Sequence, residues 1–211
     1  YDERRDLPAE PGTSSLSAAL SAGTLSVAEC FHAADRCRQQ SDCKGAHTWI
    51  GELAWRDFYR QIMANFPSLS WGEPFRKETG WVQWRRDESD FQAWCEGRTG
   101  YPLVDAGMRQ LLECGWMHNR VRMVVAMFLT KNLFIDWRWG ERWFMTHLVA
   151  GDFAANNGGG QWSASTGTDA APYFRVFNPV RQSQRFDNVG DYIRRYVPEL
   201  AALDDKLIHE P

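Results

Sequence analysis

The sequence lacks the features that mark secreted, metal-bound or membrane-embedded proteins. Its five cysteines contain no CxxC pair, and their odd number and irregular spacing argue against a disulfide framework and against structural zinc. No apolar run approaches the roughly 20 residues of a membrane helix, and no signal peptide opens the chain, which begins with Tyr1 rather than Met. We expect the chain to be a fragment of a cytoplasmic protein that binds no metal and is associated with the nucleoid if it is bacterial.

Lysine is scarce, because the chain has 4 lysines against 20 arginines at a net charge of −3. A guanidinium can grip phosphate through two hydrogen bonds and can stack on rings. Five arginines and only two acids lie between residues 172 and 196. This stripe is compatible with a phosphate backbone as partner, but on charge alone an ordinary solvated surface with ion pairs is the favoured explanation.

Alternation typical of β-strands is also missing, so the fold class predicted is all-α. The length suits one large domain or two small ones. Apolar spacing and helix caps predict helices over residues 18–22, 26–40, 47–65, 90–96, 104–114, 117–133, 141–149 and 187–196. Residues 155–167 are rich in Gly, Asn and Ser, which predicts a loop with short helical turns at most.

Tryptophan, by contrast, is abundant, with eleven residues. Within the helix expected at 47–65, Glu52, Trp55, Arg56 and Tyr59 follow the spacing i, i+3, i+4, i+7 and therefore share a face. A carboxylate, a guanidinium and two aromatic rings are an unusual core stripe. They suggest that the protein holds something aromatic or moves electrons.

Six motifs together resemble the flavin domain of the photolyase/cryptochrome family. They lie at residues 13–17 (TSSLS), 49–59 (WIGELAWRDFY), 99–106 (TGYPLVDA), 115–123 (GWMHNRVRM), 151–159 (GDFAANNGG) and 175–179 (RVFNP). The resemblance runs in the family's order along the whole chain. It implies that residues 1–211 form a multi-helical FAD-binding, DNA-lesion-binding domain without the family's N-terminal α/β antenna domain, so no antenna chromophore can be assigned.

The resemblance also implies a reaction. In this family, fully reduced, deprotonated FAD absorbs blue light and passes an electron to a pyrimidine dimer flipped out of DNA. The cyclobutane ring then splits and the electron returns. Flipping brings the lesion into the close contact that electron transfer needs, and damaged pairs unstack more easily. The chain would thus be a deoxyribodipyrimidine photo-lyase that acts as a monomer on damaged DNA, away from membranes.

The same resemblance implies which residues bind the flavin. Hydroxyls and free N–H groups at a helix start suit its pyrophosphate, although Ser and Thr there are in isolation an ordinary helix cap. Asn156 would lie beside the flavin N5 and Asp152 beside the polar edge of the ring. The full set is Tyr1, Thr13, Ser14, Ser15, Leu16, Ser17, Trp49, Arg56, Arg122, Asp152 and Asn156.

A lesion site is implied next to the flavin. Glu52 and Asn119 would hydrogen-bond the dimer between apolar walls of Trp55, Met123 and Trp162. Taken alone, these residues are explained by a surface Glu paired with the arginine at i+4 and by a Met–Trp core stripe. The catalytic set implied is Glu52, Trp55, Asn119, Met123, Asn156 and Trp162.

The resemblance implies DNA backbone contacts for four side chains, which are Arg5, Arg120, Arg175 and Gln182. They would bind phosphates rather than read bases, so DNA binding should weaken as the salt concentration rises. The DNA-binding set, including the lesion contacts, is Arg5, Glu52, Trp55, Tyr59, Asn119, Arg120, Arg175 and Gln182.

The branch of the family is indicated by Asn119 and Met123. Relatives that repair the (6-4) photoproduct carry histidine at both positions, whereas Asn and Met resemble the class I cyclobutane-dimer enzymes. A cryptochrome-type photoreceptor without repair activity is the alternative, but it usually loses the Glu52/Trp55 pair, which this chain keeps. A helical DNA-binding module without a cofactor is a more distant possibility.

Two positions depart from the family pattern. Trp84 and Trp137 match the outer two tryptophans of the family's electron-transfer chain, but the inner position is Gly160. Ala150 stands where the family usually has an Asp that pairs with the arginine at Arg122. We therefore expect slow photoreduction, weaker flavin retention, and an Arg122 that finds another partner such as Asp152, since an unpaired buried charge is costly.

Overall fold

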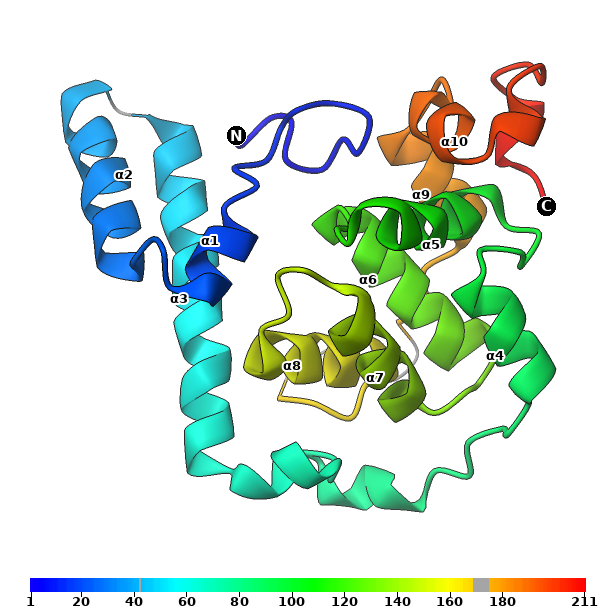
Figure 1. Cartoon of the computed structure of the whole chain (residues 1–211), viewed down its shortest axis with the longest axis horizontal. Helices are drawn as coiled ribbons and strands as arrows, with labels where there is room; N and C mark the ends of the chain where they lie inside the picture. Colours follow the sequence, from blue (N-terminus) through cyan, green and yellow to red (C-terminus); the bar gives the residue numbers. More distant parts are fainter. Residues whose placement is uncertain (42, 169–174) are drawn as a thin grey trace.

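A computed structural model describes residues 1–41, 43–168 and 175–211 of the chain. Within these ranges the protein is helical, and a single isolated bridge between Arg85 and Ile135 is its only β-type pairing, so the all-α prediction is confirmed. The α-helices are α1 (Ser17–Ala22), α2 (Val27–Ser41), α3 (Lys44–Asn65), α4 (Glu88–Cys95), α5 (Pro102–Cys114), α6 (Asn119–Met127), α7 (Trp137–His147), α8 (Phe153–Ala164), α9 (Pro179–Phe186) and α10 (Asp191–Tyr196) (Figure 1).

Shorter helical turns join these helices. They are the 3₁₀ turns η1 (Pro67–Trp71), η2 (Lys77–Trp81), η4 (Pro198–Leu200) and η5 (Leu207–His209), and the π-helical turn η3 (Phe128–Asn132). Among the described residues, no helix has both the length and the apolar character needed to cross a membrane.

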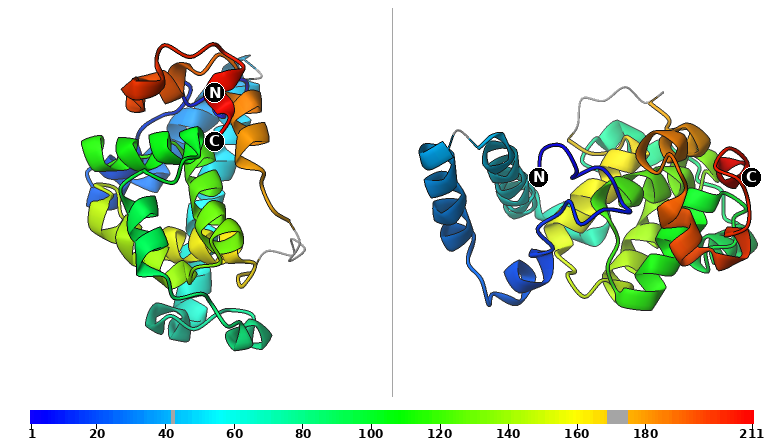
Figure 2. Two further views of the ribbon diagram at one scale, coloured as in Figure 1. Left: turned by 90° about the vertical axis from the view of Figure 1, so that its right-hand side faces the viewer. Right: turned by 90° about the horizontal axis from the view of Figure 1, so that it is seen from above.

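The α2–α3 hairpin and the C-terminal segment lie at opposite ends of the molecule (Figures 1 and 2). Between them, α8 packs against α3, α6 and α7, and α5 packs against α6 and α10. The start of α2 follows the predicted cap, because Ser26 and Glu29 satisfy each other's backbone N–H groups, at 3.1 and 2.9 Å. The helices around α8 therefore come from distant parts of the chain.

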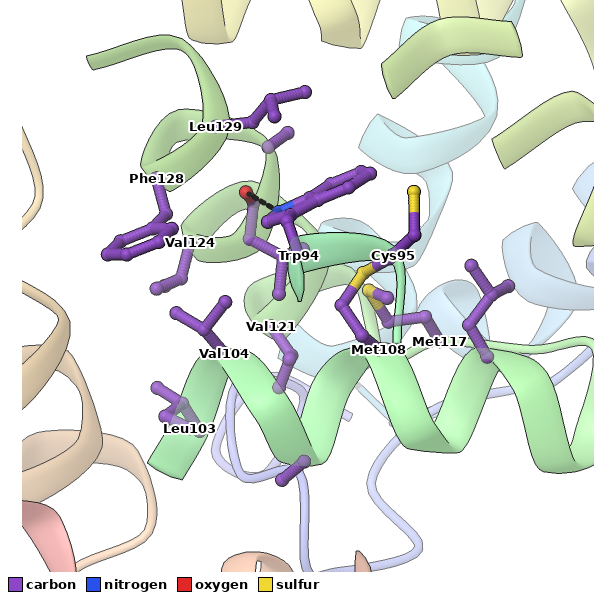
Figure 3. Close-up of a cluster of buried hydrophobic side chains, with 14 of the residues drawn as sticks. Trp94, Cys95, Leu103, Val104, Met108, Met117, Val121, Val124, Phe128 and Leu129 are labelled. Atoms are coloured by element: carbon purple, nitrogen blue, oxygen red, sulfur yellow. Dashed lines mark hydrogen bonds between the residues drawn. The ribbon is translucent and has the colours of Figure 1, made fainter. Parts of the chain in front are cut away.

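The hydrophobic core lies where α4, α5 and α6 meet. Trp94 of α4 is fully buried, and its indole N–H donates to the Val125 carbonyl at 3.1 Å, so the ring's one polar group is satisfied (Figure 3). Val104 of α5 and Val121 and Val124 of α6 gather beside it (Figure 3). This packing holds α6, which carries several of the predicted site residues, in a fixed orientation.

The loop predicted for residues 155–167 is wrong, because α8 occupies most of it. Asp152 caps the helix by accepting the Ala155 N–H at 3.0 Å. Gly158 faces Tyr59 of α3 so closely that a Cβ there would lie 2.1 Å from the tyrosine ring. Tertiary packing has therefore overridden the low helix propensity of glycine and asparagine.

Further differences concern the elements and their boundaries, among them α7, which begins at Trp137 rather than Glu141, and α10, which begins at Asp191 rather than Asp187. The long helix predicted at 117–133 is instead α6 followed by the π-helical turn η3, and Trp116 lies before α6 rather than on it. Helix α9 was not predicted, although Pro179 occupies its first turn and Asn178 caps it by accepting the Arg181 N–H at 3.0 Å. Helix α3 begins three residues earlier than predicted, at Lys44.

Candidate functional site

A cavity of about 650 Å³ lies between α3, α6, α7 and α8. All six residues predicted as catalytic line it: Glu52, Trp55, Asn119, Met123, Asn156 and Trp162. Arg5, Arg56, Tyr59 and Arg122 line it as well, so the shared face predicted for α3 is confirmed. The structure thus brings together predicted catalytic residues that lie up to 110 positions apart, from Glu52 to Trp162, and adds Arg5 from the N-terminal segment.

Glu52 is held by Arg5, whose guanidinium lies 2.6 Å from the carboxylate. The alternative in which Glu52 pairs with Arg56 is wrong, because Arg56 pairs with Asp152 at 3.0 Å. Glu52 remains part of the cavity wall. Its carboxylate is therefore placed to meet a polar ligand, with a cation at its back.

Aromatic rings and a thioether line the same cavity as this carboxylate. The Trp55 ring is 56% exposed and stands 6.1 Å from the Tyr59 ring. On α6, the Asn119 amide lies 3.8 Å from the Met123 sulfur. Two rings and a thioether beside one carboxylate and one amide suit a flat, largely apolar ligand with a few polar atoms.

The inner part of the cavity is built around Arg122, whose guanidinium is largely buried. This guanidinium donates a hydrogen bond to the Asn156 side-chain oxygen and lies 4.9 Å from the centre of the Phe144 ring. The Asn156 amide nitrogen donates to the Glu141 carbonyl at 2.9 Å, so both ends of that amide are engaged. Burial lowers the pKa of Arg122 to about 10. Among the residues that the structure describes, no carboxylate forms an ion pair with this guanidinium.

Asp152 does not balance the charge of Arg122, and the prediction that these two residues pair is wrong. It accepts ion pairs from Arg56 at 3.0 Å and from Arg60 at 2.8 Å. Burial alone would raise the pKa of Asp152, but the hydrogen bond from the Ala155 N–H and the two guanidinium groups outweigh it and lower the pKa. Asp152 therefore acts on the cavity through Arg56, which lines it.

Two buried N–H donors of the cavity wall lack a hydrogen-bond partner among the described residues. They are Nε of Arg56 and the indole nitrogen of Trp137. Buried donors in folded proteins are nearly always paired. A ligand with acceptor atoms in this cavity would satisfy them.

A second hollow, of about 1130 Å³, lies between the N-terminal segment, α2 and α3. It holds the other part of the predicted cofactor set: Tyr1, Thr13, Ser14, Leu16 and Trp49. Ser15, whose φ is 54°, and Ser17, the first residue of α1, are not among the residues that line either space. Eight of the eleven predicted cofactor residues are thus divided between two spaces that share α3 as a wall, and Ser15, Ser17 and Asp152 line neither.

The predicted electron-transfer residues are Trp84 and Trp137. Of the two, only Trp137 is part of the cavity wall. Trp137 lines both the cavity and a third hollow, of about 980 Å³, which Trp84 also lines. Gly160 lines the cavity, and a Cβ on it would lie 3.4 Å from the Trp137 ring. Gly160, Trp137 and Trp84 therefore follow one another from the cavity outwards.

The predicted DNA contacts are not all free side chains. Arg120 pairs with Asp6 at 3.0 Å and stacks on the Phe186 ring at 4.6 Å. Arg5 is engaged by Glu52. Arg175 is exposed, and Gln182 is partly buried on α9. Phosphates would have to compete with acids for Arg5 and Arg120.

Comparison with known proteins settles the family. Residues 49–211 match the family described as the FAD binding domain of DNA photolyase. The chain belongs to this family. It is 54% identical to the deoxyribodipyrimidine photo-lyases of Vibrio cholerae and of Escherichia coli, over 100% of this chain and 45% of each relative. The photolyase-family chain thus spans less than half the length of these relatives.

Solved structures agree with this assignment. A class III photolyase from Agrobacterium tumefaciens has 48% sequence identity and a TM-score of 0.96, covering 100% of this chain and 44% of that one. A cryptochrome from Synechocystis has 39% identity and a TM-score of 0.93, with the same coverage. Both branches of the photolyase/cryptochrome family therefore share this helical fold.

The cavity fits the flavin that the family name implies. The unpartnered donors of Arg56 and Trp137 can meet carbonyl or ring-nitrogen acceptors, and the cation of Arg122 can balance negative charge on a reduced ring. Residues of this photolyase domain that would hold FAD are Arg56, Arg122 and Asn156 in the cavity.

Several residues of the cavity wall were missed by sequence reasoning. On α7, Trp137, Gly140, Glu141 and Phe144 all line the cavity, and only Trp137 was predicted. Their spacing of i, i+3, i+4 and i+7 is the same signal that identified the face of α3. Thr130 and Ser163 also line the cavity, but no sequence pattern singled them out.

Proposed function

We propose that the protein containing this chain repairs cyclobutane pyrimidine dimers in DNA, using light and bound FAD. The observation that carries the proposal is the convergence of Glu52, Asn119, Met123, Asn156 and Trp162 on one cavity. Relatives at 54% identity that carry the name deoxyribodipyrimidine photo-lyase support it.

The cavity residues divide into two groups under this proposal. Arg122 and Asn156 hold and polarise the flavin, which supplies the electron when it is reduced and excited by blue light. Glu52 and Asn119 offer a carboxylate and an amide to the polar edges of a flipped-out lesion, while Trp55, Met123 and Trp162 cover its apolar parts.

We further propose that the substrate is the cyclobutane dimer, as in class I enzymes, rather than the (6-4) photoproduct. Asn119 and Met123 lie 3.8 Å apart on the cavity wall. Neither side chain is an acid that could donate a proton to a lesion at neutral pH. The Agrobacterium structure, at 48% identity, is named a class III photolyase, so the fold alone does not assign this chain to class I. Assays with defined lesions test the proposed substrate.

A cryptochrome-type photoreceptor is the second candidate, and the similarity to the Synechocystis cryptochrome favours it. The two candidates share the flavin and differ in the lesion site. Retention of Glu52 and Trp55 in the cavity supports repair.

We also propose that residues 1–211 act as one FAD- and lesion-binding domain of a monomeric, cytoplasmic protein. In this proposal an antenna domain lies outside the chain, and Arg5, Arg120, Arg175 and Gln182 contact DNA phosphates. The antenna chromophore is left unassigned.

The test uses the chain loaded with FAD and reduced by dithionite. Illumination with a dimer-containing oligonucleotide should restore the thymine absorbance, and Glu52→Ala should slow this recovery while leaving the flavin spectrum unchanged. Glu113→Ala, on the exposed face of α5, is the matched control. A yellow protein that binds but never repairs the oligonucleotide would support the photoreceptor, and a colourless one would reject both candidates.

A further inference from the structure

Two neighbouring residues of the N-terminal segment contact charged groups that the proposed function assigns to the substrate. Arg5 lies 2.6 Å from Glu52, and Asp6 lies 3.0 Å from Arg120. Glu52 lines the cavity, and Arg120 directly follows Asn119, which lines it too. The segment therefore engages a lesion-binding carboxylate and a phosphate-binding arginine through adjacent residues.

The contact between Asp6 and Arg120 is forked. Nε of Arg120 donates to Oδ1 of Asp6 at 3.2 Å, and Nη2 lies 3.0 Å from Oδ2. Arginine binds phosphate through the same arrangement of two N–H groups facing two oxygens. The carboxylate of Asp6 therefore occupies the guanidinium as a phosphate would. The nearby pair of Arg4 and Glu10 differs, because its closest approach is 3.7 Å and both side chains are exposed.

Both partners of the forked contact are held in place at the surface. The Arg120 guanidinium lies 4.6 Å from the centre of the Phe186 ring of α9. Asp6 lies within a turn that is closed by the Leu7 N–H, which donates to the Arg4 carbonyl at 3.0 Å. The side chains of Arg120 and Asp6 are 20% and 35% exposed, so an incoming polyanion can reach both.

A purely structural ion pair is the alternative explanation, since the contact ties the N-terminal segment to α6. On that explanation, removing the Asp6 carboxylate leaves DNA binding unchanged, or weakens it by loosening the segment. If Asp6 instead occupies a phosphate site, its removal strengthens DNA binding. The forked contact beside the cavity favours the second explanation, and the two explanations predict effects of opposite sign.

We propose that Asp6 is a specificity residue that blocks Arg120 from DNA phosphates until a lesion engages Glu52. The inference rests on the proposed function, because it needs Arg120 at the DNA backbone and Glu52 at the lesion. A lesion in the cavity competes with Arg5 for Glu52, and the movement of Arg5 draws its neighbour Asp6 away from Arg120. Both arginines then become available to phosphates. Undamaged DNA offers no competitor for Glu52 and meets a blocked arginine.

The first experiment measures binding of the FAD-loaded chain, in the dark, to an undamaged duplex and to the same duplex with one cyclobutane dimer. Asp6→Asn should raise the affinity for the undamaged duplex about tenfold, the effect of one charge-assisted contact, and should raise the affinity for the dimer duplex less. A rise from about 50 to about 200 mM salt should shrink the gain roughly 3.5-fold, because each added phosphate contact contributes an exponent of about 0.9 to the salt dependence.

The second experiment separates local blocking from net charge. Glu10→Gln is the matched control, because it removes a negative charge from the same segment and Glu10 pairs with Arg4 instead; it should change neither affinity. In an Arg120→Gln background, Asp6→Asn should give no gain, and an equal gain there would overturn the proposal.

Unchanged or weaker binding of Asp6→Asn to the undamaged duplex would also overturn the proposal, while leaving the proposed function in place. Failure of the unaltered chain and of every variant to bind either duplex would overturn the proposed function, and this inference with it.

Discussion

Arg122 on α6 donates a hydrogen bond to Asn156 on α8, and so joins two helices across the floor of the cavity. The two residues are 34 positions apart. Because the guanidinium is largely buried and forms no ion pair with a carboxylate in the described parts of the chain, its charge is available to a ligand. This contact links the fold of α8 to the electrostatics of the site.

Replacing the Arg122 guanidinium should weaken FAD binding without lowering the stability of the FAD-free protein. We expect Arg122→Gln to weaken binding of reduced FAD by about 1.5–3 kcal/mol, the range for a hydrogen bond to a charged group. The free energy of unfolding of the FAD-free protein should stay the same or rise, because an unbalanced buried charge is removed. Fluorescence titration and urea unfolding measure the two quantities.

Arg142→Gln is the control, since Arg142 is exposed on the same helix as Phe144. It should change neither quantity. Unaltered FAD affinity in Arg122→Gln would show that the buried cation does not act on the flavin.

The close approach of α3 and α8 predicts a contrast between neighbouring glycines. Gly158→Ala should destabilise the protein by about 1–3 kcal/mol through overpacking, since its Cβ would meet the Tyr59 ring. Gly159→Ala meets nothing within 4 Å and should stabilise the helix by about 0.5–1 kcal/mol. Urea unfolding of both variants without FAD measures the difference, and equal effects would mean that α8 does not pack closely on α3.

Gly160 predicts a change in light-driven reduction. Gly160→Trp should place an indole between the cavity and Trp137, and shorten the distance that an electron must cross. We expect oxidised flavin to bleach faster under blue light with an external thiol donor, by roughly an order of magnitude. Gly160→Leu fills space without a redox-active ring and should give no gain; an equal gain in both variants would indicate a packing effect.

His118, the N-cap of α6, predicts how stability depends on pH. Burial lowers its pKa from 6.5 to about 4. Below pH 6.5, His118 therefore binds a proton in the unfolded chain but stays neutral in the folded protein. The free energy of unfolding falls as the pH drops towards 4. The slope should be at most about 1.4 kcal/mol per pH unit.

His118→Asn replaces the ring nitrogen Nδ1, which accepts the Arg120 N–H, with an amide oxygen that can also cap, and it removes the titrating group, so it should flatten this part of the stability profile. His32→Asn, on the exposed surface of α2, should leave the profile unchanged. The measurement is urea unfolding from pH 4 to pH 7. A slope that persists in His118→Asn would assign it to other groups.

The sequence was sufficient for the fold class, for most helices and for many of the residues of α3 and α6 that line the cavity. Glu52 and Trp55 could be grouped because a helical repeat places them on one face, and Asn119 and Met123 for the same reason. Their convergence from α3 and α6 on one cavity follows from tertiary packing, which no periodicity encodes.

The sequence was least informative where tertiary contacts decide local structure. The glycines of α8 favour a loop on their own, and only their fit against Tyr59 and Trp137 makes a helix there favourable. The partner of Asp152 was mistaken for a similar reason, because Arg60 lies on α3, far from Asp152 in sequence and beside it in space. Charge pairs of this kind depend on the packed helices.

The contact between α3 and α8 also has a consequence for biosynthesis. Tyr59 emerges from the ribosome about 100 residues before Gly158, which at roughly 5–20 residues per second is a delay of several seconds. During that interval the face of α3 that meets α8 has no α8 to cover it, and α8 is the last of the four cavity walls to be made. Flavin capture must therefore wait for translation to pass α8, and chaperones have a window in which to bind the nascent chain.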